Sequence, residues 1–182
     1  SAGQTFTLDI ACTPGQSIKS YELELSFNPT LLHVNSVTEG DIFDGYDTFF
    51  NDGTINNTSG TIVDVYGLIL GTGGVTSPGS LITVSFTAQS ASGSSTIGLS
   101  DVGITNETSY VPITTTNGTV ILREFILSIT ISGSGTVTKN PNQAAYDWST
   151  LVLITATPQS GWQFVRLSGD LSFSVNPINV MI

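Results

Sequence analysis

QSIKSYELELSFNPTLLHVNSV, residues 16–37, is the stretch of sequence that decides the fold. Its apolar side chains alternate strictly with polar ones: Tyr21, Leu23, Leu25 and Phe27 alternate with Ser20, Glu22, Glu24 and Ser26. A period of two predicts a β-strand with one dry face and one wet, acidic face. Pro29 ends the strand, because proline fixes φ and has no amide proton for a sheet ladder. Residues 31–37 form a second apolar run, so the stretch predicts neighbouring strands of a β-sandwich.

The same alternation recurs along the first two thirds of the chain. Strand-like runs occupy residues 5–12, 61–70, 81–88 and 118–122, with turns rich in Gly, Asn and Ser between them. In residues 96–105 the phase changes between Leu99 and Val102, which predicts a β-bulge near Ser100 and Asp101. No window has the i, i+3, i+4 spacing of an amphipathic helix. About nine short strands predict an all-β, jelly-roll sandwich.

A second, smaller β-rich domain is predicted after Arg123. A new apolar run begins at residues 125–131. Gly133, Gly135 and Gly161 then mark turns, so the sequence pattern differs from that of the first part of the chain. No Pro-, Gly- or Ser-rich linker separates the two parts of the chain, so we expect a short boundary between the domains. The predicted domains are residues 1–123 and residues 124–182.

Composition excludes several classes of partner. The chain has 14 acidic and 4 basic residues and a formal charge of −10, so it repels nucleic acids and anionic membrane surfaces. It has no run of about 18 apolar residues, so we expect no membrane insertion. The Thr-rich β composition favours a secreted or cell-surface protein. Glycosylation sequons, which favour the same location, begin at Asn56, Asn57, Asn106 and Asn117.

The sequence offers no catalytic residue set. His33 is the only histidine and no G-x-S-x-G elbow is present, so nucleophilic catalysis is not expected. Cys12 is the only cysteine, which excludes an internal disulfide, and one His with one Cys cannot supply a zinc site. Because Cys12 is in phase with Ile10, we expect it on the dry side of a strand. The chain is therefore predicted not to be an enzyme.

An acidic loop is a candidate calcium site. It contains Asp41, Asp44, Asp47 and Asp52, whose oxygens are the ligands that calcium prefers. The spacing does not fit an EF-hand, because Phe43 and Gly45 stand at the third and fifth positions from Asp41. A structural calcium site and a solvated acidic loop both remain open.

Residues 1–123 carry a series of motifs in a fixed order. They are Gln16-x-Ile18-x-x-Tyr21-x-Leu23-x-Leu25-x-Phe27-x-Pro29, Val37-x-x-Gly40-Asp41, Gly79-x-Leu81-x-x-Val84-x-Phe86-x-Ala88, Ile97-x-Leu99-x-Asp101-Val102 and Asn117-Gly118-x-Val120. This series resembles the cohesin domain, the receptor module that docks dockerins in cellulosomes and related surface assemblies. The resemblance implies a jelly-roll fold and a dockerin-bearing partner.

The resemblance also implies a docking face. Carried over by position, its contact residues are Ser20, Glu22, Asp47, Asn51, Val65 and Gly67. A register that differs by one residue would place Asp64 and Tyr66 on this face instead. Acidic contacts favour a basic or hydroxyl-rich partner helix; the alternative is that Glu22 and Glu24 only solubilise a wet face.

Aromatic residues leave other functions open. Tyr46, Phe49, Phe50 and Tyr66 also suit a carbohydrate-binding module with a polysaccharide ligand. A third possibility is a structural adhesin or surface-layer segment without a dedicated ligand. Trp162 is spaced from Phe164 as on a strand, so we expect it in a core.

The second domain resembles the divergent B-repeat of internalin-like bacterial surface proteins. The matching motifs are Gly133-x-Gly135-x-Val137, Val152-x-Ile154-x-Ala156-x-Pro158-x-x-Gly161-x-x-Phe164, Ser168-Gly169-Asp170 and Asn176-Pro177. Leu167 stands where the family usually has tryptophan, and Ser149 where it often has glycine. The family adds one more strand after the position of Ile182, so we expect a truncated module. The resemblance implies a spacer or an adhesion stalk.

Overall fold

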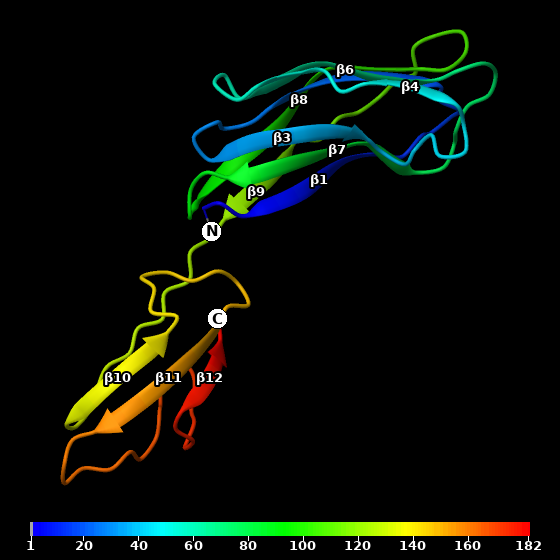
Figure 1. Cartoon of the computed structure of the whole chain (residues 1–182). Helices are drawn as coiled ribbons and strands as arrows, with labels where there is room; N and C mark the ends of the chain where they lie inside the picture. The colour runs from blue at the N-terminus through cyan, green and yellow to red at the C-terminus, as the bar shows by residue number, and fades with distance from the viewer. Residues whose placement is uncertain (1) are drawn as a thin grey trace. The chain divides into compact units, whose positions relative to one another are not determined.

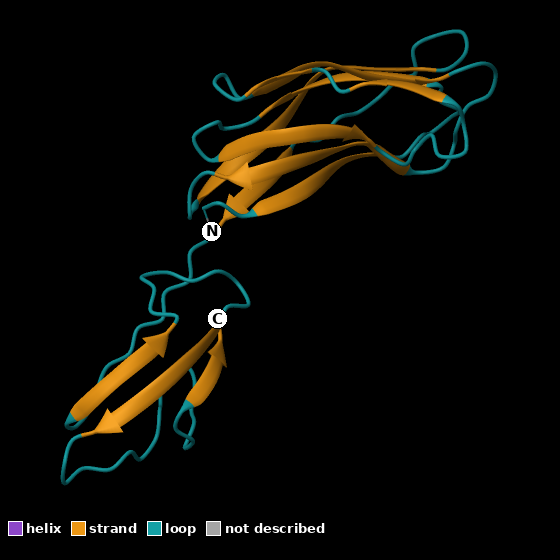
Figure 2. Cartoon of the chain, in the orientation of Figure 1, coloured by secondary structure: helices purple, strands orange, loops and turns teal. Residues whose placement is uncertain are grey.

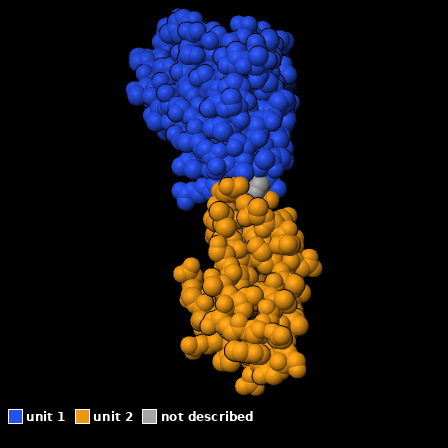
Figure 3. Space-filling view, turned by 90° about the vertical axis from the view of Figure 1, so that its left-hand side faces the viewer, with its two compact units in different colours: residues 1–123 blue, residues 124–182 orange. Residues whose placement is uncertain are grey.

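The computed structural model describes residues 2–182, and these form strands, turns and loops without a helix (Figures 1 and 2). The predicted all-β class is therefore confirmed. Among the described residues there is accordingly no helix that could cross a membrane. The chain divides into two compact units, unit 1 (Ser1–Arg123) and unit 2 (Glu124–Ile182), which Figure 3 colours separately.

Unit 1 is the predicted jelly-roll sandwich. Its strands are β1 (Thr5–Cys12), β2 (Ser20–Ser26), β3 (Leu32–Glu39), β4 (Thr48–Asn51), β5 (Thr54–Asn56), β6 (Thr61–Ile69), β7 (Gly79–Ala88), β8 (Gly93–Thr105) and β9 (Gly118–Leu122). One antiparallel sheet has the order β1-β7-β3, and the other has the order β4-β6-β2-β8-β9 with β5 beside β6 (Figure 1). The apolar faces of the two sheets meet in one core.

The dry face of β2 lies in this core as the alternation predicts. Tyr21, Leu23 and Leu25 are each at most 2% exposed. The Tyr21 hydroxyl donates a 2.6 Å hydrogen bond to the carbonyl oxygen of Leu81 on the facing sheet. The one polar atom of this buried face is thereby paired, and it ties the two sheets together.

Two β-bulges break the ladders on either side of β2. The pairing with β6 shifts between Leu23 and Leu25, and the pairing with β8 shifts between Glu22 and Glu24. Asp64 on β6 and Asp101 on β8 take positive φ values of 60° and 46°. The bulge predicted near Asp101 is confirmed, and the one at Asp64 is a second. Both open beside the middle of β2, which brings polar residues of three strands together.

An asparagine amide completes the edge strand β3. Asn57 Oδ1 accepts a 2.7 Å hydrogen bond from the amide of Val34, and Asn57 Nδ2 donates a 3.0 Å bond to its carbonyl. The side chain thus binds both backbone groups of one residue, as a neighbouring strand would. Val34 is 2% exposed, so water cannot replace this partner.

Replacing Asn57 by alanine should destabilise unit 1 by about 1–3 kcal/mol, the cost of leaving buried polar groups unpaired. Chemical denaturation measures the loss. Asn35→Ala is the matched control, because this exposed amide binds hydroxyl groups, and it should change stability by less than about 0.5 kcal/mol. Equal effects of the two variants would contradict the role assigned to Asn57.

Unit 2 has a three-stranded antiparallel sheet, β10 (Gly135–Asn140), β11 (Leu151–Pro158) and β12 (Ile178–Met181), in that order. Its buried hydrophobic residues are Tyr146, Val152, Ile154 and Val180. The prediction that Trp162 lies in a core is wrong, because Trp162 is 58% exposed. It lies in a turn after β11, where its amide donates to the carbonyl of Gln159, and not on a strand with an inward face.

Candidate docking face

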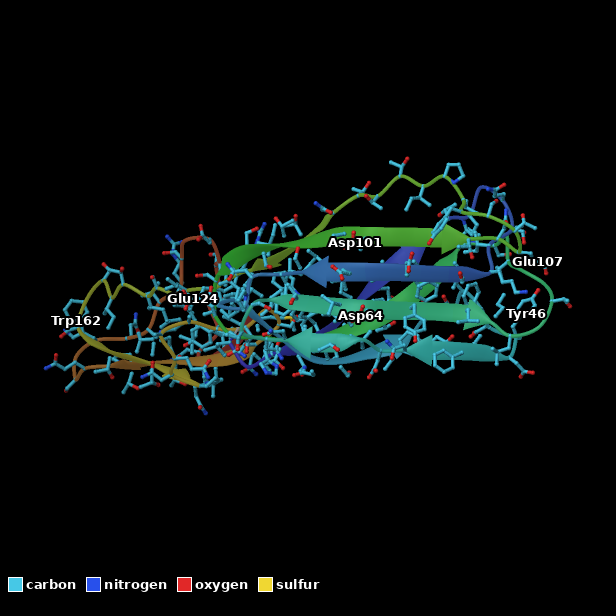
Figure 4. All side chains as sticks on the ribbon, turned by 90° about the horizontal axis from the view of Figure 1, so that it is seen from above. Tyr46, Asp64, Asp101, Glu107, Glu124 and Trp162 are labelled. Carbon is cyan, nitrogen blue, oxygen red and sulfur yellow. The ribbon has the colours of Figure 1, made fainter. Side chains whose placement is uncertain are left out.

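The outward face of β4, β6, β2 and β8 carries two rows of cross-strand neighbours, which share a face because directly paired residues point the same way. The rows are Phe49, Leu68, Ser20 and Thr105, and Asn51, Tyr66, Glu22 and Gly103. Figure 4 looks onto this sheet, with Asp64 and Asp101 on the strands that flank β2. We call this surface the docking face.

Four of the residues predicted for this surface are accessible there. Ser20, Glu22 and Asn51 belong to the two rows. Asp47 is exposed just before β4, where its carbonyl accepts a 2.8 Å hydrogen bond from the amide of Leu70. Their role in binding remains a prediction.

The placement of Val65 and Gly67 on this face is wrong. Val65 is 0% exposed and belongs to the core. A Cβ on Gly67 would lie 2.6 Å from the ring of Tyr21, so this position also faces inward. Val65 and Gly67 pair with Leu23 and Tyr21, which sets them on the dry side of the sheet. The alternative register is the one found, with Tyr66 pointing outward.

An acidic hollow of about 490 Å³ lies at the centre of the docking face. The carboxylates that line it are Glu22, Glu24, Asp64 and Asp101, with the rings of Tyr66 and Tyr110 beside them. Tyr110 Oη donates a 3.2 Å hydrogen bond to Glu22 Oε1. Sequence reasoning missed Asp101 and Tyr110 as surface residues, although the phase change at Asp101 marked the bulge that brings it here.

The charge of this hollow is not balanced within the described residues. Lys19 and Arg123 are the basic residues of unit 1. Lys19 Nζ lies 3.6 Å from Glu107 Oε1 and donates to the carbonyl of Gly71, outside the hollow. Partial burial raises the pKa of Glu24, and the negative charges of Asp101 and Asp64 raise it further. The hollow therefore attracts a cation.

Glu24→Gln should stabilise the protein at neutral pH. A carboxyl group with a raised pKa in the folded state loses folding stability as the pH rises through its titration, so the penalty is complete at neutral pH. The variant removes this penalty. Its thermal midpoint should exceed that of the wild type at pH 7.5, with the difference vanishing below the ordinary pKa of glutamate. A midpoint difference independent of pH would contradict this electrostatic origin.

An aromatic strip borders the acidic hollow. Phe49 and Tyr66 stack with their ring centroids 6.0 Å apart and an interplanar angle of 22°. They are 50% and 38% exposed, and Leu70 nearby is 51% exposed. Exposed aromatic rings beside charged groups are typical of protein recognition surfaces.

The acidic loop is tied to the sandwich, and the histidine lies on an edge strand. Asp41 Oδ1 accepts hydrogen bonds of 2.6 and 2.7 Å from the amide and hydroxyl of Ser80, which lower the pKa of Asp41 and tie the loop to β7. No group of three or more His, Cys, Asp or Glu residues within residues 2–182 is arranged to hold a metal ion. His33 is exposed on the edge strand β3.

Comparison with known proteins agrees with both resemblances. Residues 1–122 match the family model of the cohesin domain, and residues 126–181 match that of the divergent InlB B-repeat domain. Both predictions of family are thereby confirmed. No curated protein matches the chain.

Solved structures similar to the chain include a non-cellulosomal cohesin from Archaeoglobus fulgidus, 21% identical, with a TM-score of 0.54 over 66% of this chain and 82% of that one. A ScaC cohesin of Acetivibrio cellulolyticus, solved with the ScaB dockerin, is 16% identical, with a TM-score of 0.55 over 67% of this chain and 91% of that one. An OlpC cohesin of Clostridium thermocellum, also solved with a dockerin, is 17% identical, with a TM-score of 0.54 over 67% and 86% of the two chains. These similarities show the fold.

Proposed function

Because the chain belongs to the cohesin family, we propose that unit 1 is a non-catalytic module that docks a dockerin-bearing protein. The observation that supports this most is the docking face itself, where an exposed aromatic strip adjoins an acidic hollow. The cohesins of Acetivibrio cellulolyticus and Clostridium thermocellum named above were solved as complexes with dockerins.

The docking face defines the chemistry of its partner. Phe49 and Tyr66 offer rings for an apolar side chain, and burial of such rings contributes most of the affinity in many interfaces. Glu22, Glu24 and Asp101 offer acceptors for a lysine or arginine, which would supply the positive charge that the lining of the hollow lacks. A partner surface with one apolar anchor beside a basic residue therefore complements this face in shape and charge.

The second unit bears on where the protein acts. We propose that the protein acts outside the cell or on its surface, with unit 2 as a spacer or adhesion stalk behind the docking module. The match of residues 126–181 to a divergent InlB B-repeat supports this, together with the Thr-rich, acidic composition.

Retention of a dockerin-bearing protein tests the proposed function. The whole chain is immobilised, proteins secreted by its source organism are applied in the presence of calcium, and retained proteins are identified by mass spectrometry. We expect a protein with a dockerin sequence to be retained. Removing the aromatic anchor with Tyr66→Ala and reversing charge with Glu22→Arg should weaken retention at least about tenfold, since a lost central contact costs 2 kcal/mol or more.

Asp9→Arg is the matched control for charge reversal. Asp9 is exposed on β1, in the opposite sheet, where it accepts a hydrogen bond from Thr83. This variant should keep full retention. If no dockerin-bearing protein is retained, or if Glu22→Arg binds as well as Asp9→Arg, the docking face is not the site of this interaction.

The exposed pair Phe49 and Tyr66 also supports a second candidate, a carbohydrate-binding function, because sugars stack on accessible aromatic rings. Saturable binding of a soluble polysaccharide that is lost in Tyr66→Ala, with no protein retained, would favour this candidate over docking.

A further inference from the structure

The outer edge of β8 carries an interrupted hairpin. At one end the amide of Val111 donates a 2.8 Å hydrogen bond to the carbonyl of Ile104. At the other end Gly118 pairs with Ile97, and Asn117 Oδ1 accepts a 3.1 Å bond from the amide of Leu99. The two ends of the hairpin have the same register. As many residues lie between Ile97 and Thr105 on β8 as between Tyr110 and Gly118 on the returning segment.

Residues 112–116, which we call the strap, nevertheless leave this hairpin open. Within residues 2–182 the strap makes no backbone–backbone hydrogen bond. All of its residues are exposed, including Ile113 at 39%. In Figure 4 the segment between β8 and β9 arcs away from β8 beyond Asp101. The Asp101 bulge interrupts the edge of β8 beside the strap.

A cavity of about 410 Å³ lies between the strap, the end of β1 and the edge of β8. Ile18, Leu23 and Ile104 of the core form part of its wall, and Leu99 and Val102 reach it from β8. The volume falls within the roughly 300–1,000 Å³ typical of small-molecule sites. No lining residue carries a charge, although the chain has 14 acidic residues. The cavity therefore differs in chemistry from the acidic docking face.

The closed ends of the hairpin limit what enters this cavity. Val111 is bonded to Ile104, and Asn117 is bonded to Leu99, so a polypeptide would have to be threaded through a closed loop. A compact molecule needs only displacement of the strap, which no backbone hydrogen bond opposes. The absence of charged lining excludes ions, which would lose hydration without gaining a counter-charge.

We propose that the cavity beneath the strap is a binding site for a compact, neutral molecule with an apolar body about the size of two or three aromatic rings, with the strap as its movable cover. Binding removes the apolar walls from water and gives Leu99 and Val102 the packing that a paired strap would have given them. This site is separate from the docking face and does not depend on its function.

Cys12 provides a reporter at this site. It lines the cavity, is half-buried and is the only cysteine of the chain. Burial raises the pKa of its thiol, so at neutral pH the group is protonated and adds no charge to the cavity. A bound molecule should shield this sulfur from a thiol reagent.

The neutral fluorophore N-phenyl-1-naphthylamine serves as the probe, with the whole chain. We expect saturable fluorescence enhancement, and a rate of Cys12 alkylation by N-ethylmaleimide about tenfold lower when nine-tenths of the sites are occupied. Leu99→Trp should fill the cavity and abolish the enhancement. Ile121→Trp is the control, because Ile121 is 58% exposed on β9 and lies outside the cavity.

Prior alkylation of Cys12 is the second test, which does not depend on the folding of Leu99→Trp. The adduct should occupy the cavity and abolish probe binding, with folding checked by circular dichroism. Fluorescence that does not saturate, alkylation of Cys12 at an unchanged rate with bound probe, or equal binding to the alkylated protein would each overturn the proposal. A probe that binds only to exposed apolar residues of unit 2 would leave the rate of Cys12 alkylation unchanged, and this result would overturn the proposal.

Discussion

Phe86→Ala should destabilise unit 1 by about 3–5 kcal/mol, the cost of removing an aromatic side chain from a packed core. Phe86 lies on β7, the central strand of its sheet, and is 1% exposed. Its ring centroid lies 5.7 Å from that of Phe6 in a stacked pair and 5.7 Å from that of Phe27 in an edge-to-face pair. The substitution leaves these rings facing a void. Urea denaturation followed by circular dichroism measures the change.

Phe49→Ala is the matched control for this prediction. It removes the same atoms from a ring that is 50% exposed on the docking face. Its stability should fall by less than about 1 kcal/mol, because little apolar area leaves water in the folded state at this position. The two variants thus separate packing from binding, since the first should lower stability and the second should lower retention of the partner. A similar loss of stability in both would contradict the core assigned to unit 1.

Tyr146→Ala should unfold unit 2. Tyr146 is 0% exposed and is the largest of its fully buried side chains. Its hydroxyl donates a 3.1 Å hydrogen bond to the carbonyl of Pro141. Removal costs about 3–5 kcal/mol, which approaches the whole stability of a domain of about 60 residues. Trp148 and Trp162 are the two tryptophans of the chain, so tryptophan fluorescence reports on unit 2 alone.

Tyr146→Phe provides the graded control, because it keeps the ring and removes only the hydroxyl. Its cost should be about 1–3 kcal/mol, the net value of the two hydrogen bonds that the hydroxyl makes, one to the carbonyl of Pro141 and one from the amide of Gln143. A cooperative, tryptophan-detected transition that persists unshifted in Tyr146→Ala would show that this residue is not the centre of the unit 2 core.

The alternation of residues 16–37 predicts the architecture of unit 1 because each inward position of β2 is also buried in the structure. The same periodicity cannot show which side chains of β6 point toward the core. Its bulge at Asp64 adds one residue, which changes the side of every later position, and the pattern around Val65 and Gly67 contains too few polar residues to reveal it. The acidic hollow could not be predicted from the sequence either, because Asp101 reaches it only through a bulge on a separate strand.

In unit 2 the sequence pattern was less informative. Trp162 and Phe164 have the spacing of a strand, but a turn after β11 holds this segment away from the core. Large apolar residues normally predict burial because a core must exclude water. In a domain this small, however, much of the apolar surface stays accessible. Local spacing therefore cannot separate inward from outward aromatic residues there.

The amide of Asn57 also makes the protein vulnerable to chemical ageing. The side chain can replace a strand only while it has both a donor and an acceptor, since it binds the amide and the carbonyl of Val34. Deamidation to aspartate removes the donor and sets a carboxylate oxygen against that carbonyl. Asn57 is therefore a site at which hydrolysis of a single side-chain amide would weaken the edge of the sandwich and shorten the working life of the protein.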